Sequence, residues 1–143
     1  MRPDRSWSGL VWAASFNLLA VCAVASDSTL AAVDVPHGHP SSFKWVELPE
    51  FGGKEAVIYR SPDGTRVAAA FHESGSATFT YPFDEFLVVT SGSVTISVHG
   101  GSTFTLATGD VAYLREGMTV DFRFSHDFSD ITCLTSNHIV KWR

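Results

Sequence analysis

From Phe43 to the C-terminus, apolar and polar residues alternate in short runs broken by glycine, proline, aspartate and serine. Alternation with a period of two is typical of β-strands, and no stretch shows the 3.6-residue period of an amphipathic helix. We predict strands at residues 43–48, 55–59, 65–72, 77–81, 85–90, 94–98, 103–106, 111–114, 119–124 and 130–134. Short strands at such regular spacing predict an all-β domain, either a sandwich or a barrel.

The breaks between these runs contain the residue types that tight β-turns require. They read Ser61-Pro62-Asp63-Gly64, Ser91-Gly92-Ser93, His99-Gly100-Gly101, Thr108-Gly109-Asp110 and Arg115-Glu116-Gly117. The turns therefore support the strand boundaries independently of the hydrophobic pattern.

Two of the predicted strands show which of their faces is buried. Their apolar positions are Val94, Ile96 and Val98 in one strand, and Val120, Phe122 and Phe124 in the other. Because polar residues separate these positions, each strand should have one face in the core and one in water. In contrast, Phe86-Leu87-Val88-Val89 is apolar on both faces. We expect the N-terminal arm or the second subunit of a homodimer to cover its outer side.

The N-terminus has the pattern of a secretory signal peptide over residues 1–25. Arg2 and Arg5 precede an apolar run over residues 10–25, which ends in the small-x-small sequence Ala23-Val24-Ala25. We expect cleavage near Ser26 and a mature protein that is periplasmic or secreted, with no attachment to the membrane after cleavage.

Two alternatives for this segment remain open. It could be a membrane anchor, although the run is shorter than the ~20 residues of a spanning helix and contains Ser15 and Asn17. It could also be a lipoprotein signal acylated at Cys22, although Val21 is larger than the residue expected before such a cysteine.

The composition allows one globular domain and excludes some partners. The chain has 143 residues, of which 45% are hydrophobic and 17% charged. Its formal net charge is −5 and it contains no run of lysine or arginine, so we expect no nucleic-acid partner. After cleavage at residue 25, Cys133 would have no cysteine partner within the chain, which predicts a fold without an intrachain disulfide.

Residues 26–42 are small and polar and are interpreted as a linker or an N-terminal arm. The segment contains His37-Gly38-His39, which could bind a stray metal ion. Two nitrogens without a third ligand nearby favour a plain linker instead.

The stretch from Tyr81 to Gly92 resembles the first signature of the cupin superfamily, with its glutamate and glycine present as Glu85 and Gly92. Residues 108–117 resemble the start of the second signature, with Arg115 in place of its proline. Within the superfamily, Tyr81-Pro82-Phe83-Asp84-Glu85-Phe86 is similar to the ureidoglycine aminohydrolase-like branch. The resemblance implies a cupin-type β-barrel, also called a jelly roll or double-stranded β-helix, over residues 43–143.

Metal-binding cupins hold a divalent ion with three histidines and one glutamate, and this sequence keeps only the glutamate, Glu85. The paired histidine positions fall on Phe79 and Tyr81, or on Thr78 and Thr80. The third histidine position falls on Val120 and the trailing asparagine position on Phe124. Because one carboxylate cannot complete a coordination shell, we predict no metal site, no cofactor and no stoichiometric transition metal in the purified protein.

Two functions are compatible with these residues. The first is the binding of a small polar metabolite, such as a sugar or a nitrogenous compound, in an aromatic-lined barrel mouth. The candidate binding residues are Glu85, Tyr81, Phe79, Phe83, Phe122 and, with the weakest support, His72. Each aromatic side chain could instead be a filler of the core.

The second function is a metal-independent hydrolase or isomerase of a ureide or sugar acid. Glu85 would be its general acid or base, assisted by Tyr81 or His72. If Glu85 faces the interior beside Leu87 and Val89, burial should raise its pKa. Alternatively, Glu85 only accepts hydrogen bonds from the Tyr81 hydroxyl or from backbone amides.

Overall fold

A computed structural model describes residues 34–141. All ten predicted strands are present in this part of the chain, and their bounds differ from the predicted ones by a few residues at most. The strands are β1 (Trp45–Leu48), β2 (Gly53–Arg60), β3 (Arg66–His72), β4 (Gly75–Thr80), β5 (Asp84–Ser91), β6 (Ser93–Val98), β7 (Thr103–Ala107), β8 (Val111–Leu114), β9 (Thr119–Phe124) and β10 (Ser129–Thr135). Two short 3-10 turns, Pro40–Ser42 and Pro49–Phe51, flank β1.

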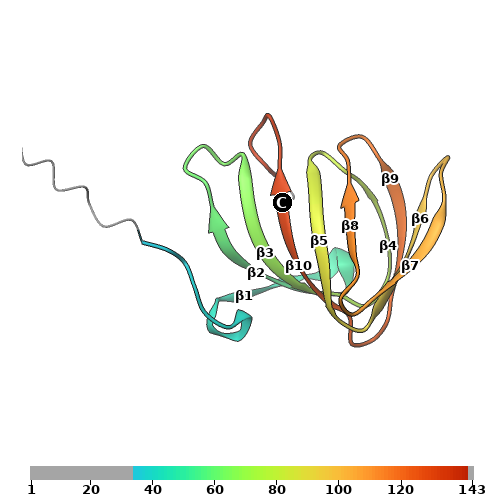
Figure 1. The fold of residues 1–143 in the computed structure, drawn as a ribbon, viewed down its shortest axis with the longest axis horizontal. Helices are drawn as coiled ribbons and strands as arrows, with labels where there is room; N and C mark the ends of the chain where they lie inside the picture. The colour runs from blue at the N-terminus through green and yellow to red at the C-terminus, as the bar shows by residue number, and fades with distance from the viewer. Residues whose placement is uncertain (1–33, 142–143) are drawn as a thin grey trace, which may run out of the picture. The chain divides into compact units, whose positions relative to one another are not determined.

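The strands form two antiparallel sheets that face each other as a barrel (Figure 1). One sheet has the order β1-β2-β3-β10-β5-β8, and the other has the order β4-β9-β6-β7. Strands distant in the sequence lie side by side, such as β3 beside β10 and β4 beside β9. The prediction of an all-β jelly roll is confirmed.

The core lies between the sheets and follows the predicted alternation. In β6 and β9 the inward positions include Val94, Ile96 and Val120, which are buried. The outward positions carry hydroxyl and charged groups, for example Asp121 of β9, which accepts a hydrogen bond from Thr78 of the neighbouring strand β4. This sheet therefore has one face buried in the core and one face exposed to solvent, as the sequence predicted.

β5 differs from these strands because both of its faces are apolar. Glu85, Leu87 and Val89 point inward and are buried, which confirms the predicted alternation. On the outer side, Phe86 is 42% exposed and Val88 is half-buried. The described part of the chain thus leaves much of this outer face open.

The predicted signal peptide lies outside the described residues, as does the first part of the arm. Within residues 34–141, no helix is long and apolar enough to cross a membrane. The ring of His37 bonds the carbonyl of Val35, and the His39 ring accepts a hydrogen bond from the Ser41 amide. The two histidines therefore have local structural roles in the arm. Cys133 is free and exposed.

Candidate functional site: an acidic, aromatic-lined cavity

The barrel contains a partly open cavity of about 60 Å³ between its two sheets. Fifteen side chains line it: Leu48, Phe51, Phe71, Glu73, Phe79, Tyr81, Phe83, Glu85, Leu87, Val94, Phe122, Phe124, Phe128, Asp130 and Leu134. More than half of them are aromatic, three are acidic, and none is lysine, arginine or histidine. The cavity wall is therefore apolar with an acidic polar part.

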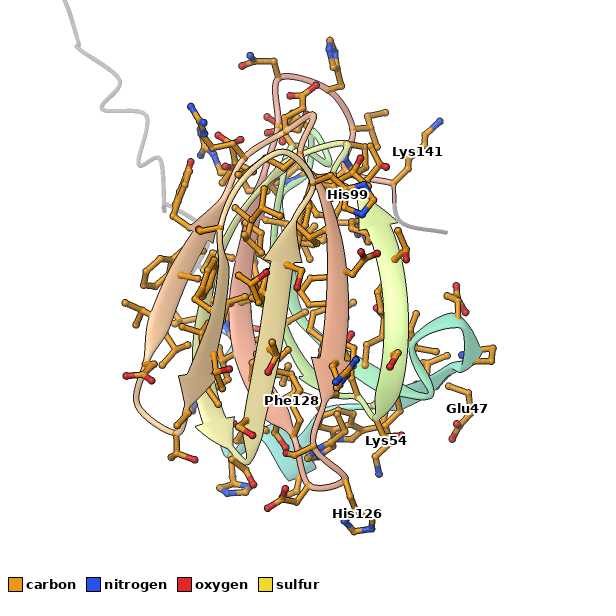
Figure 2. All side chains as sticks on the ribbon, turned by 90° about the vertical axis from the view of Figure 1, so that its right-hand side faces the viewer. Glu47, Lys54, His99, His126, Phe128 and Lys141 are labelled. Carbon is orange, nitrogen blue, oxygen red and sulfur yellow. The ribbon has the colours of Figure 1, made fainter. Side chains whose placement is uncertain are left out.

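The aromatic rings hold one another in place through edge and stacking contacts. Phe79 meets Tyr81 edge to face with ring centroids 4.9 Å apart, and Phe122 stacks on Phe124 at 5.2 Å. Phe128 adjoins Phe124 at 5.0 Å. Figure 2 shows Phe128 near the end of the barrel that carries Lys54 and His126, far from His99. Such ring pairs stabilise the wall beyond the burial of their area.

The entrance is marked by the lining residues that keep contact with water. Phe51, Glu73 and Phe79 are half-buried, whereas the other lining residues are buried. The rings of Phe51 and Phe79 touch edge to face, with centroids 5.5 Å apart. Phe51 ends the 3-10 turn Pro49–Phe51, and its backbone carbonyl accepts a hydrogen bond from the amide of Ser74. Glu73 thus lies at the rim, directly after β3.

Glu85 is held inside the barrel by two hydroxyl groups. The Tyr81 hydroxyl donates to Glu85 Oε2 at 2.5 Å, and Thr132 Oγ1 lies 2.6 Å from Glu85 Oε1. Burial raises the pKa of Glu85, and the hydrogen bonds from Thr132 and Tyr81 lower it in part. Burial, with the charge of Glu85, also raises the pKa of Tyr81 well above its usual value, so this phenol stays a donor.

The hydrogen bonds of Thr132 are compatible with a proton on Glu85. Thr132 Oγ1 lies 2.9 Å from the carbonyl of Phe86 as well as 2.6 Å from Glu85 Oε1, but a hydroxyl has only one proton to donate. If Glu85 is protonated on Oε1, it donates to Thr132, and Thr132 donates to Phe86. The hydroxyls of Tyr81 and Thr132, the Glu85 carboxyl and the Phe86 carbonyl then each have a hydrogen-bond partner. The geometry agrees with the raised pKa of Glu85 and favours its neutral form.

Asp130 is the second buried carboxyl of the cavity. It lies at an inward position of β10, next to a register shift between β10 and β5 at Ser129. The side chain is 5% exposed, and its Oδ1 atom is buried without a hydrogen-bond partner. Burial and the charge of Glu85 raise its pKa well above the usual value. An unpartnered buried carboxyl costs stability and is uncommon in native proteins.

Glu73 completes the acidic part of the wall. Burial raises its pKa well above the usual value, and the charges of Asp130, Glu85 and Glu55 raise it further. Glu55 itself is a buried residue of β2. These carboxyls repel one another when charged, so each one favours the neutral form of its neighbours.

The cavity brings together most of the candidate binding residues. Five of the six line it: Phe79, Tyr81, Phe83, Glu85 and Phe122. Glu85 accepts the hydrogen bond from Tyr81 that the sequence analysis considered as an alternative to a catalytic role. It also bonds Thr132, which the sequence analysis did not predict.

The structure does not bring His72 to the cavity, which corrects the expectation that it could face the barrel mouth. Because side chains alternate along β3, Phe71 points inward and His72 outward. The His72 ring stacks on Trp45 with centroids 4.6 Å apart and bonds the Ser129 hydroxyl through Nδ1. It lines a groove on the outer side of the sheet instead.

The sequence interpretation missed Asp130 and Glu73. Alternation places Asp130 on the same face as Thr132 and Leu134, and this signal was available. It was masked because Ile131 and Cys133, on the opposite face, are as hydrophobic as core residues but are exposed. Glu73 directly follows the predicted end of its strand, where alternation can no longer be assumed.

The residues at the cupin metal positions do not fit a metal ion. Phe79 and Tyr81, not Thr78 and Thr80, point inward, and Val120 is fully buried opposite Phe79. Glu85 is occupied by its two hydroxyl partners. Among residues 34–141, no three histidine, cysteine, aspartate or glutamate side chains are grouped so that they could hold a metal ion. A metal-free purified protein stays a prediction, to be measured by elemental analysis after dialysis.

Two comparisons relate the barrel to known proteins. A family model described as the EutQ-like cupin domain matches residues 60–129. Among solved structures, the chain resembles a protein assigned as ethanolamine utilization protein Q (EutQ) from Salmonella typhimurium LT2. The identity is 19% and the TM-score 0.58, over 66% of this chain and 80% of that chain. The barrel has the cupin fold.

Two further solved structures show how widely this cupin fold is shared. KdgF from Halomonas sp. is 15% identical with a TM-score of 0.56, over 66% of this chain and 89% of that chain. HutD from Pseudomonas fluorescens SBW25 is 15% identical with a TM-score of 0.61, over 68% of this chain and 58% of that chain. No curated protein matches the chain. At these identities the likeness shows the fold and leaves the ligand to be argued from the cavity.

Proposed function

We propose that this cupin domain binds a small polar metabolite inside its barrel and does so outside the cytoplasm. The observation that carries the proposal is the cavity itself, whose apolar wall contains polar groups converging from β5 and β10. A concave, mostly apolar site with a few placed polar groups is the usual form of a small-molecule site. The export part of the proposal is supported by the signal-peptide pattern of residues 1–25.

The size of the cavity limits the ligand. Its volume of about 60 Å³ is far below the ~300–1,000 Å³ of sites for drug-sized molecules. A molecule with few non-hydrogen atoms therefore fits better than a disaccharide or a nucleotide. The resemblance to ureidoglycine aminohydrolase-like cupins supports including small ureides among the candidates.

A thermal-shift screen of the mature protein tests the proposal. The compounds are small amines, alcohols, ureides, sugar acids and divalent metals, because a ligand held only by the folded state raises the melting temperature. Phe79→Ala should reduce any shift by opening the cavity wall. Phe86→Ala is the matched control, since this phenylalanine is partly exposed on the outside of the barrel. Equal shifts in both variants, or no shift with any compound, would contradict binding in the cavity.

A metal-independent enzyme is the second candidate function, and the buried position of Glu85 in the cavity wall, with its raised pKa, favours it specifically. A carboxyl that keeps its proton in a buried site is suited to general acid catalysis. Glu85→Gln would then abolish the donated proton and lower turnover of a ureide or sugar-acid substrate by ten-fold or more, about 1.4 kcal/mol. Binding without any turnover in the wild-type protein would exclude this candidate.

A further inference from the structure

We propose that the ligand of the cavity is a small organic cation, an ammonium ion of few non-hydrogen atoms, with the Asp130 carboxylate as its counter-charge. This inference rests on the proposed function, because it names the chemical class of the molecule bound in the same cavity. Three independent features of the wall carry it: an unpartnered carboxylate oxygen, the absence of basic side chains from the lining, and the aromatic faces.

The first feature is the Oδ1 atom of Asp130. It is buried and has no hydrogen-bond partner, while the side chain lies at the cavity wall and is 5% exposed. Glu85 differs, because the hydroxyls of Tyr81 and Thr132 occupy both of its oxygens. Asp130 thus has an unused acceptor for a donor that enters the cavity. An N–H group of an ammonium ion supplies a charge-assisted hydrogen bond to such an oxygen.

The second feature is the sign of the charges around Asp130. Glu85, Glu73 and Tyr81 share the cavity with it, and the charge of Glu55 also acts on Glu73. Lys54 and His72 line the groove on the outer side, which Asp130 also borders. Neither of them bonds Asp130: His72 bonds Ser129, and Lys54 lies over the Trp45 ring and points away from the barrel (Figure 2).

Such a site offers an anion no positive partner, and any of its carboxyls that ionises gains from a cation. A bound cation would offset the mutual repulsion of the carboxyls and stabilise their charged forms. The pKa of Asp130, which burial and Glu85 now raise, would fall when the cation binds, and Glu73 would respond in the same direction. Binding should therefore release protons to the solvent.

The third feature is the aromatic wall. The negative face of an aromatic ring attracts ammonium ions, and clustered rings form the cages that recognise alkylated amines. The wall contains eight rings: Phe51, Phe71, Phe79, Tyr81, Phe83, Phe122, Phe124 and Phe128. Rings combined with one free carboxylate suit an organic cation better than a metal ion, since phenylalanine supplies no atom for metal coordination. The small volume selects for short alkyl groups.

Isothermal titration calorimetry of the mature protein tests the inference with one matched set of probes. These are methylammonium, ethylammonium and propylammonium chloride, with 1-propanol as the neutral analogue and propionate as the anionic one. We expect an ammonium ion to bind at least ten-fold more tightly than 1-propanol and propionate. Titration at pH 7 in two buffers of different ionisation enthalpy should show a net release of protons.

The variants assign the binding to Asp130. Asp130→Asn keeps the shape of the side chain and removes its charge, so we expect at least a ten-fold loss of ammonium affinity. Asp121→Asn is the matched control, because Asp121 is an exposed aspartate on the outer face of the same barrel and should leave the affinity unchanged. Far-UV circular dichroism and the melting temperature show whether each variant is folded.

The outcomes separate this inference from the proposed function. Binding of a neutral or anionic compound that Phe79→Ala weakens, without ammonium binding, would overturn the inference and keep the proposed function. No binding of any compound by the wild-type protein would overturn both. Ammonium binding by the wild-type protein without proton release would also overturn the inference, and this result does not depend on whether Asp130→Asn folds. Equal ammonium affinities in Asp130→Asn and Asp121→Asn would overturn it as well.

Discussion

The raised pKa of Glu85 favours a protonated carboxyl inside the barrel. With that proton, Glu85 donates to Thr132 and accepts from Tyr81, and Thr132 is free to donate to the carbonyl of Phe86. Without it, Thr132 donates to the charged carboxylate, and a negative charge remains in a cavity wall that contains no lysine, arginine or histidine. The neutral carboxyl is therefore part of the packed interior.

Glu85→Gln tests this description through the pH dependence of stability. Because the folded-state pKa of Glu85 is raised, its contribution is fully present below the unfolded pKa of about 4.3 and is lost as pH rises through the folded value. Glutamine does not titrate and can donate to Thr132 as the neutral acid does. We expect similar unfolding free energies at pH 4 and a variant that is more stable at pH 8, by on the order of 1 kcal/mol.

Urea denaturation at a series of pH values measures this difference. Glu116→Gln, at an exposed position between β8 and β9, is the control and should follow the wild-type profile. A Glu85→Gln protein that is several kcal/mol less stable than wild type at pH 4 would show that a charged Glu85 stabilises the fold.

For individual residues, strand alternation predicted the apolar side chains that point into the barrel. It did not identify the polar side chains that also point inward. Phe79, Tyr81 and Phe122 were predictable because they are apolar at inward positions of clearly alternating strands. Asp130 was not selected because hydrophobicity alone would place Ile131 inward in its stead. Hydroxyl partners such as Thr132 are set by the pairing of β10 with β5, which no local pattern contains.

Among the secondary-structure elements, the strands were predictable because alternation and turn residues agree at almost every boundary. The pairing order was not, since β3 and β4 follow each other in the chain but lie in different sheets. The register shifts between β2 and β3 and between β5 and β10 could not be predicted from the alternation either, because an extra residue in a strand depends on the partner strand. These irregularities lie in the sheet that carries Asp130.

Gly92 shows how one turn fixes the position of a neighbouring loop. It has a φ of 66°, and a Cβ atom there would lie 2.4 Å from Ser125 Oγ and 2.9 Å from the Cα of Phe128. Gly92→Ala should cost about 1–2 kcal/mol for the left-handed backbone and a further ~1–3 kcal/mol for the clash. The loop from Ser125 to Phe128 leads directly into β10.

Gly109→Ala provides the matched control for this variant. Its φ is 91°, but a Cβ atom would meet nothing within 4 Å, so only the backbone strain applies. Chemical denaturation of the two variants should give a clearly larger loss for Gly92→Ala. Equal losses would show that the loop moves aside without cost.

For the whole molecule, the open outer face of the six-stranded sheet predicts a homodimer. Phe86, Val111, Tyr113 and Ile131 on neighbouring strands are 42%, 54%, 58% and 36% exposed. The patch reaches β8, the edge strand of this sheet, so two copies related by a two-fold axis could bury the same face of each. Multi-angle light scattering of the mature protein should give twice the chain mass. Phe86→Thr with Val111→Thr should give the monomer, and a wild-type monomer would contradict the prediction.

Export is the other prediction that concerns the whole chain. If residues 1–25 are a cleaved signal, intact-mass analysis of protein recovered from the periplasm or medium should give a chain that begins at or near Ser26. Ala23→Leu with Ala25→Leu should slow cleavage, because the processing site requires small residues. Recovery of wild-type protein from outside the cytoplasm with Met1 still present would contradict the prediction.

The hydrogen bond from Tyr81 also occupies the Glu85 oxygen that a metal ion would need. Phe79 and Val120 are directly opposite each other in the register of β4 and β9, and Tyr81 is the next inward position. Histidines at these three positions would place imidazoles around Glu85, and the loss of the phenol would release one of its oxygens. Phe79→His, Tyr81→His and Val120→His together should therefore retain about one zinc ion per chain after dialysis. The same variant with Glu85→Gln should retain less zinc, because the carboxylate ligand is then lost.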